Sequence, residues 1–106
     1  MVVPTTMPPM SRSLLERRLT ELSERLKELR ADLVRTDEQL APLAEAADDA
    51  RLRALVSETP LADREHHDAQ KHADAMGRHR AAVTAQIEQL ERQQDELLDR
   101  LMAESR

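Results

Sequence analysis

The stretch Ser57-Glu58-Thr59-Pro60 separates two halves of the chain whose apolar patterns mirror each other. In each half, twelve positions recur at alternating steps of four and three residues, and we call these positions the seam. The seam of the first half is Leu15, Leu19, Leu22, Leu26, Leu29, Leu33, Thr36, Leu40, Leu43, Ala47, Ala50 and Ala54. The seam of the second half is Ala62, His66, Ala69, Ala73, Met76, Arg80, Val83, Ile87, Leu90, Gln94, Leu97 and Leu101. Paired outward from the stretch, the residue numbers of every pair add to 116, which indicates an antiparallel heptad repeat.

This pattern predicts an all-α fold, a long two-helix antiparallel coiled-coil hairpin. The expected segments are a disordered N-terminal leader 1–12, the hairpin 13–102 and a frayed tail 103–106. Within the hairpin, we expect helix one at about 14–56, the hinge at 57–60 and helix two at about 61–102. At roughly 1.5 Å per residue, two helices of this length form a rod and not a compact domain.

Local signals support these boundaries. Ser13 and Glu16 have the spacing of a capping box at the start of helix one. Thr59 is placed to cap helix two, with Pro60 at its first position, where a missing N–H has no cost. Pro42 lies inside helix one and faces away from the seam. Because the register continues through it without a slip, we favour a kink over a break that would give three helices.

The composition narrows the function classes. The 106 residues include no Phe, Trp, Tyr or Cys and only one Gly, and 35% of them are charged. A high content of charged residues with a heptad period is typical of coiled coils. The missing cysteines exclude disulfides, thiolate nucleophiles and zinc ribbons, and they favour a cytoplasmic location.

The charge pattern bears on the partners. The net charge is −5 and basic residues alternate with acidic ones, so we expect no direct binding to nucleic acid. No apolar run approaches the roughly 20 residues that span a bilayer, so we expect no membrane partner. Arginine outnumbers lysine 14 to 2, which we interpret as the codon bias of a GC-rich, bacterial genome.

One layer of the seam, Thr36 opposite Arg80, is polar on both sides, and we interpret it as a register-setting layer. Towards the hinge the seam consists mostly of alanine, so the two helices are expected to approach closely there. Two flanking charge pairs are also expected near the hinge: Arg51 with Asp63, and Arg53 with Glu65.

The residues that carry chemistry do not form a recognisable catalytic or metal site. The four histidines, His66, His67, His72 and His79, lack the i, i+4 spacing of a helical metal pair. No nucleophile with a base, phosphate loop or sizeable concavity is expected between two helices, so we predict no enzyme activity, no cofactor and no metal. His66 occupies a seam position, and we single it out as a candidate pH-sensitive residue.

Four apolar side chains near the hinge point away from the seam: Leu52, Leu55, Val56 and Leu61. Two interpretations stay open. The side chains fold over one another as a cap, or reflect a register shift after Pro42. Alternatively, they form a docking patch, because clustered exposed apolar residues mark protein interfaces.

The run Pro60-Leu61-Ala62-Asp63-Arg64-Glu65 follows the hinge of a long antiparallel hairpin. In this respect residues 14–102 resemble the coiled-coil arm of the DksA/TraR-type and Gre-type regulators, which enter the secondary channel of bacterial RNA polymerase. The resemblance implies that acidic residues at the tip reach towards the catalytic centre of the polymerase.

The leading hypothesis is therefore a non-catalytic interaction module that docks on a partner protein, not identified by the sequence, through its tip. The expected partner-binding residues are Leu52, Leu55, Val56, Glu58, Leu61, Asp63 and Glu65. The alternatives are a transcription regulator that binds RNA polymerase, and a structural, self-associating helical rod. The chain is accordingly expected to be a monomer or a homodimer.

Overall fold

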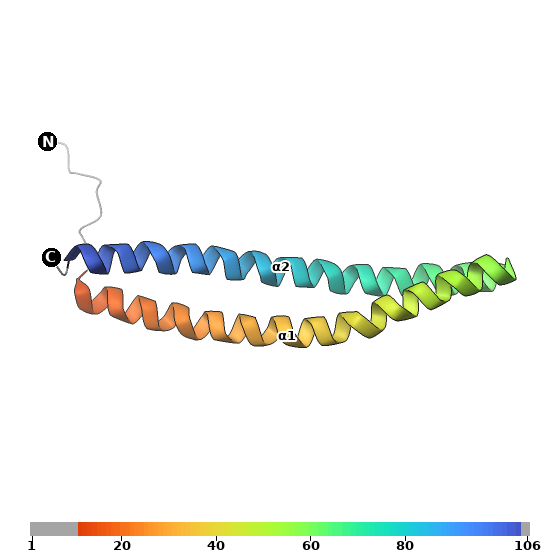
Figure 1. The fold of residues 1–106 in the computed structure, drawn as a ribbon, viewed down its shortest axis with the longest axis horizontal. Coiled ribbons are helices and arrows are strands. Elements are labelled where there is room, and N and C mark those ends of the chain that lie inside the picture. The colour runs from red at the N-terminus through yellow and green to blue at the C-terminus, as the bar shows by residue number, and fades with distance from the viewer. Residues whose placement is uncertain (1–10, 105–106) are drawn as a thin grey trace, which may run out of the picture.

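A computed structural model describes residues 11–104, which form a helical hairpin. Helix α1 spans Arg12–Ser57 and helix α2 spans Pro60–Glu104, and the two run antiparallel, side by side, over a length of 68 Å (Figure 1). The described residues are 97% helical and contain no strand. The predicted all-α hairpin is thus confirmed. Residues 1–10 of the expected leader and 105–106 of the expected tail lie outside the described range.

The seam predicted from the sequence is the core of the hairpin. All twelve seam residues of α1 and eleven of the twelve on α2 are buried or half-buried, and Arg80 is the exception. Within the described residues, two side-chain hydrogen bonds join the helices in the same register. Arg80 donates to Asp37, and Gln94 Nε2 donates to Ser23 Oγ at 3.2 Å. The residue numbers of both pairs add to 117, one away from the 116 of the seam pairs.

The core is graded along the rod. A cluster of Leu26, Leu29, Val83 and Ile87 forms its centre in the open half, by which we mean the half of the rod away from the hinge. Towards the hinge, the buried residues are Ala47, Ala50, Ala54, Ala62 and Ala73. A fully buried leucine, isoleucine or valine stabilises a fold by about 1.5–3 kcal/mol, and an alanine methyl group by much less. Most of the free energy of unfolding therefore comes from the open half.

The start of α1 corrects one prediction. Ser11, not Ser13, caps the helix: its Oγ accepts a hydrogen bond from the Leu14 N–H at 3.2 Å. The Glu16 carboxylate accepts from Arg12 Nε at 3.1 Å, so it does not complete a capping box. The side-chain oxygen of an N-cap serine accepts a hydrogen bond from the backbone N–H three residues later. Leu14 provides this N–H for Ser11 and Glu16 would provide it for Ser13, so the spacing does not decide which serine caps the helix.

Pro42 lies within α1, and the helix continues through it without a break into two segments. Figure 1 shows α1 bending in its yellow stretch, which contains this position. Proline removes one backbone hydrogen bond and its ring crowds the preceding turn, which bends a helix. The side chain is exposed, so the bend leaves the seam continuous.

The hinge is shorter than predicted, because Ser57 ends α1 and Pro60 begins α2. Glu58 adopts a left-handed conformation with φ 49° and ψ 36°, and its N–H donates to the Ala54 carbonyl at 3.1 Å. Thr59 caps α2 as predicted, since its Oγ1 accepts from the Ala62 N–H at 3.2 Å. At the other end, α2 runs to Glu104, two residues beyond the predicted end.

Glycine at position 58 is expected to stabilise the hairpin. The left-handed conformation costs a residue with a Cβ about 1–2 kcal/mol, whereas glycine loses roughly 0.4–1 kcal/mol more entropy on folding. We expect Glu58→Gly to raise the free energy of unfolding by about 0.5–1 kcal/mol, measured by urea unfolding with circular dichroism. Glu58→Ala is the control for loss of the charge, and an equal gain in both variants would contradict the prediction.

Truncation of a core leucine is expected to have a far larger effect than truncation at the hinge end. Leu26 is 1% exposed and Leu55 is 64% exposed. We expect Leu26→Ala to lower the free energy of unfolding by about 2–5 kcal/mol, and Leu55→Ala to change it by less than about 0.5 kcal/mol. The same urea titration measures both, and similar losses would show that the core is not where the seam places it.

Candidate functional site

The hinge end exposes four large apolar side chains, which we call the apolar band. Their exposed fractions are 53% for Leu52, 64% for Leu55, 86% for Val56 and 63% for Leu61. The seam register does not slip after Pro42, and side chains exposed to this degree do not cover one another. The interpretation as a cap or a register shift is therefore wrong, and the apolar band faces solvent.

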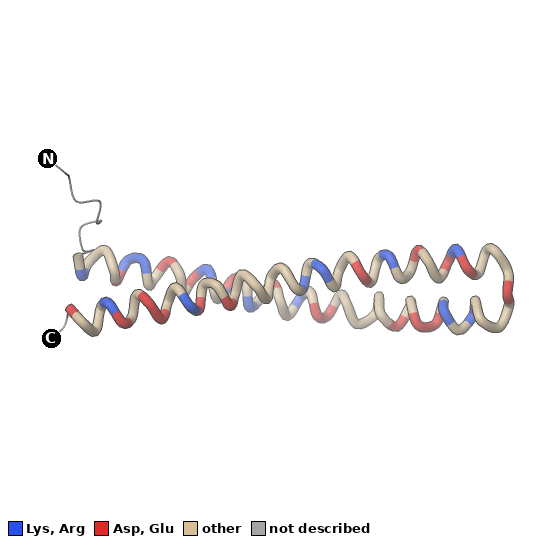
Figure 2. Tube along the Cα trace, turned by 90° about the horizontal axis from the view of Figure 1, so that it is seen from above, with Lys and Arg blue, Asp and Glu red and all other residues tan. Residues whose placement is uncertain are grey.

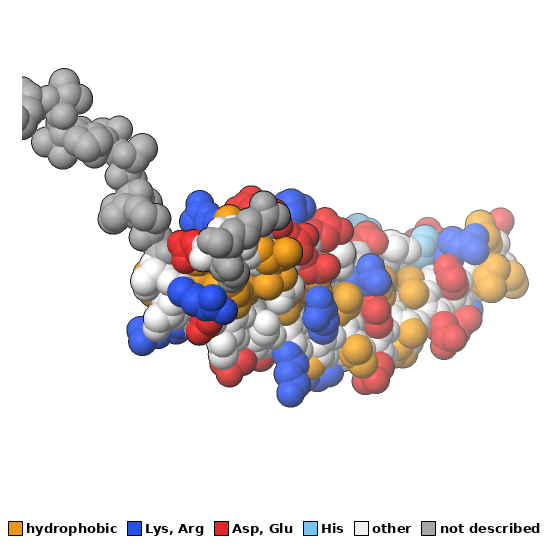
Figure 3. Space-filling view, turned by 60° about the vertical axis from the view of Figure 1, so that its left-hand side comes forward, with side chains coloured by type: hydrophobic (Ala, Val, Ile, Leu, Met, Phe, Trp, Pro, Cys, Tyr) orange, Lys and Arg blue, Asp and Glu red, His pale blue; other side chains and the backbone are white. Residues whose placement is uncertain are grey.

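The apolar band lies at the hinge end and includes residues of both helices. Leu52, Leu55 and Val56 have the i, i+3, i+4 spacing that places side chains on one face of a helix, and this face of α1 points away from α2. Leu61 belongs to the first turn of α2, directly after the hinge. Figure 3 shows hydrophobic side chains at the far, hinge end of the rod, next to acidic ones.

The acidic residues predicted to bind a partner are exposed there as well. Glu58, Asp63 and Glu65 are all exposed and, within residues 11–104, none takes part in an ion pair. The predicted pairs of Arg51 with Asp63 and Arg53 with Glu65 do not form. Exposed ion pairs contribute only about 0–1 kcal/mol to the free energy of unfolding and restrict two long side chains, so these charged groups stay hydrated instead of pairing.

The predicted polar layer differs from expectation. Thr36 is 2% exposed, and its hydroxyl donates to the Asp32 carbonyl of its own helix at 2.8 Å. Arg80 turns out of the seam and donates to the Asp37 carboxylate. This hydrogen bond, aided by the negative charge of Asp37, raises the pKa of Arg80. A guanidinium stays hydrated where it can, so Arg80 links the helices at their flank and does not meet Thr36.

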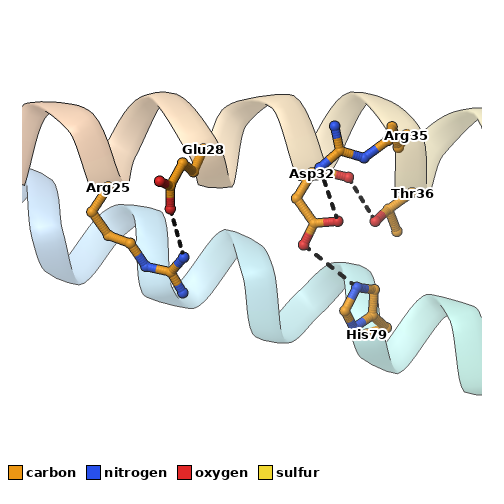
Figure 4. Close-up of polar contacts among 6 residues, drawn as sticks. All are labelled: Arg25, Glu28, Asp32, Arg35, Thr36 and His79. Atoms are coloured by element: carbon orange, nitrogen blue, oxygen red, sulfur yellow. Dashed lines mark hydrogen bonds and ion pairs between the residues drawn. The ribbon is translucent and has the colours of Figure 1, made fainter.

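An open groove of about 550 Å³ lies between the helices in the open half, where no concavity was expected. Asp32 is its central acid: the carboxylate lies 3.7 Å from His79 Nε2 on α2 and 3.9 Å from an Arg35 nitrogen (Figure 4). Arg25 and Glu28 form a second pair at 3.2 Å. The charged groups of the groove thus interact mainly with one another.

The sequence reasoning missed the roles of Asp32 and Asp37. Each flanks a seam residue, Leu33 and Thr36 respectively, and so lies where side chains of two helices meet. The signal was present for Asp37, because Arg80 is the only seam residue with a positive charge and its pair position, 36, is the neighbour of Asp37. The i, i+3 spacing of Asp32 and Arg35 was a second signal.

The histidines bring no metal site together. In the described part of the chain, no group of three or more His, Cys, Asp or Glu side chains is arranged to hold a metal ion. His66 is half-buried at its seam position, whereas His67 and His72 are exposed. A pH-sensitive role for His66 stays a hypothesis. Comparing thermal unfolding of the wild type and His66→Leu between about pH 5 and 8 tests it, and equal shifts in both would remove it.

Comparison of the chain with models of protein families, with curated protein sequences and with solved structures gives no match. Neither helix of the described residues is long and apolar enough to cross a membrane. The candidate site is therefore defined by its geometry and chemistry: an exposed apolar band and unpaired acidic side chains at the hinge end.

Replacement of Thr84 by valine is expected to stabilise the hairpin. The Thr84 hydroxyl is buried on α2 and has no hydrogen-bond partner among residues 11–104, and an unsatisfied buried polar group costs about 1–3 kcal/mol. We expect Thr84→Val to raise the free energy of unfolding by about 1 kcal/mol. Thr36→Val is the control, because the Thr36 hydroxyl has a partner. Chemical unfolding measures both, and a gain in Thr36→Val as large as in Thr84→Val would contradict the explanation.

Proposed function

We propose that the chain is a non-catalytic interaction module, a stiff helical hairpin that docks on a partner protein through its hinge end. The observation that carries the proposal is the apolar band. Four large apolar side chains, each more than half exposed, lie within ten residues of one another, from Leu52 to Leu61. Exposed apolar side chains that cluster in this way are typical of protein interfaces.

The shape of the hairpin supports the same function. The two paired helices hold the hinge end up to 68 Å from the chain termini of the described part. The buried residues near the hinge are alanines, so the helices pack closely and the end of the rod is narrow. A narrow, stiff rod presents its end to a recess in a partner without exposing the seam. The proposal includes no catalytic step and no cofactor.

A second candidate is the transcription regulator that inserts the hairpin tip into the secondary channel of bacterial RNA polymerase. The observation that favours it is the exposure of Glu58, Asp63 and Glu65, which have no ion-pair partner among the described residues. Both functions place the protein in the bacterial cytoplasm that its composition predicts. A self-associating rod is the remaining alternative, and the molecular mass in solution tests it.

Loss of the apolar band is expected to abolish docking. We expect Leu55→Ser with Leu61→Ser to reduce capture of the partner from a bacterial lysate more than tenfold, because each buried leucine contributes about 1.5–3 kcal/mol. Captured proteins are identified and quantified by mass spectrometry. The matched control is Val34→Ser with Leu98→Ser, which are 58% and 42% exposed and lie away from the hinge. Circular dichroism checks that both double variants fold.

Equal capture by the wild type and the hinge variant would contradict the proposal. Recovery of RNA polymerase subunits, lost on replacement of Glu58, Asp63 and Glu65 by amides but kept in the leucine variant, favours the second candidate. A mass of two chains by light scattering that falls to one in the control variant favours the self-associating rod.

A further inference from the structure

Most of the net charge of the chain lies in its hinge half. Residues 36–80, which the seam pair Thr36 and Arg80 bounds, contain ten acidic and six basic side chains, whereas the rest of the chain contains eleven acidic and ten basic ones. The half that carries the apolar band therefore accounts for −4 of the net charge of −5. Figure 2 shows acidic positions along both helices near the hinge and at the turn itself.

Within the described residues, three of the eleven acids of the open half form an ion pair, and one of the ten acids of the hinge half does. In the open half, Glu16, Glu28 and Asp32 each lie within ion-pair distance of an arginine. In the hinge half, Asp37 is the only acidic residue that forms an ion pair within the described part of the chain, and its partner is Arg80. The groove of Figure 4 is thus nearly neutral, while the acids around the hinge keep their charge available to a partner.

The unpaired acids surround the apolar band. Asp48 and Asp49 precede Leu52 by four and three residues, which places them one helical turn away. Around Leu61, Asp63 and Glu65 follow on the first turns of α2. The surface therefore combines an apolar contact area with a rim in which acids outnumber bases two to one, six to three, between residues 48 and 68.

We infer that the hinge end binds an apolar surface of a partner protein rimmed by lysine or arginine. This inference rests on the proposed docking function and specifies the chemistry of the partner. A second copy of the hairpin does not fit, because two hinge ends would bring together halves that each carry a net charge of −4. Rim charges of this kind act over roughly the Debye length of 10 Å at 0.1 M salt, so the attraction depends on ionic strength.

Two short amphipathic helical peptides test the inference with the full chain. Both have a leucine face, and one carries lysine and the other glutamate at all remaining positions. We expect the wild-type hairpin to bind the lysine peptide in fluorescence anisotropy, at least about tenfold more tightly than the glutamate peptide, and less tightly as NaCl rises from about 50 to 300 mM.

Variants locate the binding. Replacing Glu58, Asp63 and Glu65 by amides is expected to weaken binding of the lysine peptide about fivefold to tenfold and to reduce its salt dependence. The matched control replaces three acids of the open half: Glu91→Gln, Asp95→Asn and Glu96→Gln. These acids are also exposed and without an ion pair in the described residues, and the control is expected to bind like the wild type.

Each outcome decides the inference. Equal binding of the two peptides, no binding of either, or equal loss in the hinge and control amide variants overturns it. The docking function itself is tested separately, by capture with the leucine variants. If capture depends on Leu55 and Leu61 but not on the three hinge acids, docking stands and a basic rim on the partner is refuted.

Discussion

The structure depends on one constraint: two helices have only one line along which they can bury apolar side chains. Every seam residue must therefore lie on that line, and a step of three or four residues in α1 must be matched by one in α2. This is why the residue numbers of the pairs add to a constant, and why a turn of two residues at Glu58 and Thr59 suffices to set the register of the whole rod. Nearly all other side chains face solvent.

A single line of contacts also makes stability uneven. The open half buries leucine, isoleucine and valine, and its flanks carry most of the ion pairs of the described residues. The hinge half buries mostly alanine. A region with fewer buried apolar contacts opens more easily. The helices are therefore held together mainly at the end away from the candidate site. The hinge end is then free to keep a surface that does not serve folding.

The seam could be predicted from the sequence because the heptad spacing repeats over twenty-four positions. A single residue that does not fit the pattern, such as Arg80, does not change the predicted register. The exposed apolar band followed from the same register, and the Thr59 cap followed from the preference for threonine at a helix N-cap before a proline. Single polar side chains were harder. Arg80 pairs with Asp37, and the two expected arginine pairs near the hinge do not form. For an exposed charge, the free-energy difference between an ion pair and hydration is below about 1 kcal/mol. Residue spacing alone does not predict which of these exposed pairs form, or which of Ser11 and Ser13 caps α1.

Three departures from the rules of a stable hairpin occur within residues 48–68. Large apolar side chains face solvent, Glu58 holds a left-handed conformation that glycine adopts more easily, and acids outnumber bases without ion pairs. None of these features stabilises the fold, and polar or neutral residues would serve the seam equally well. The open half contains the large apolar core and most of the ion pairs of the described residues. Departures that gather at one end of a fold are typical of functional sites. The hinge end is therefore better explained by a binding partner than by folding.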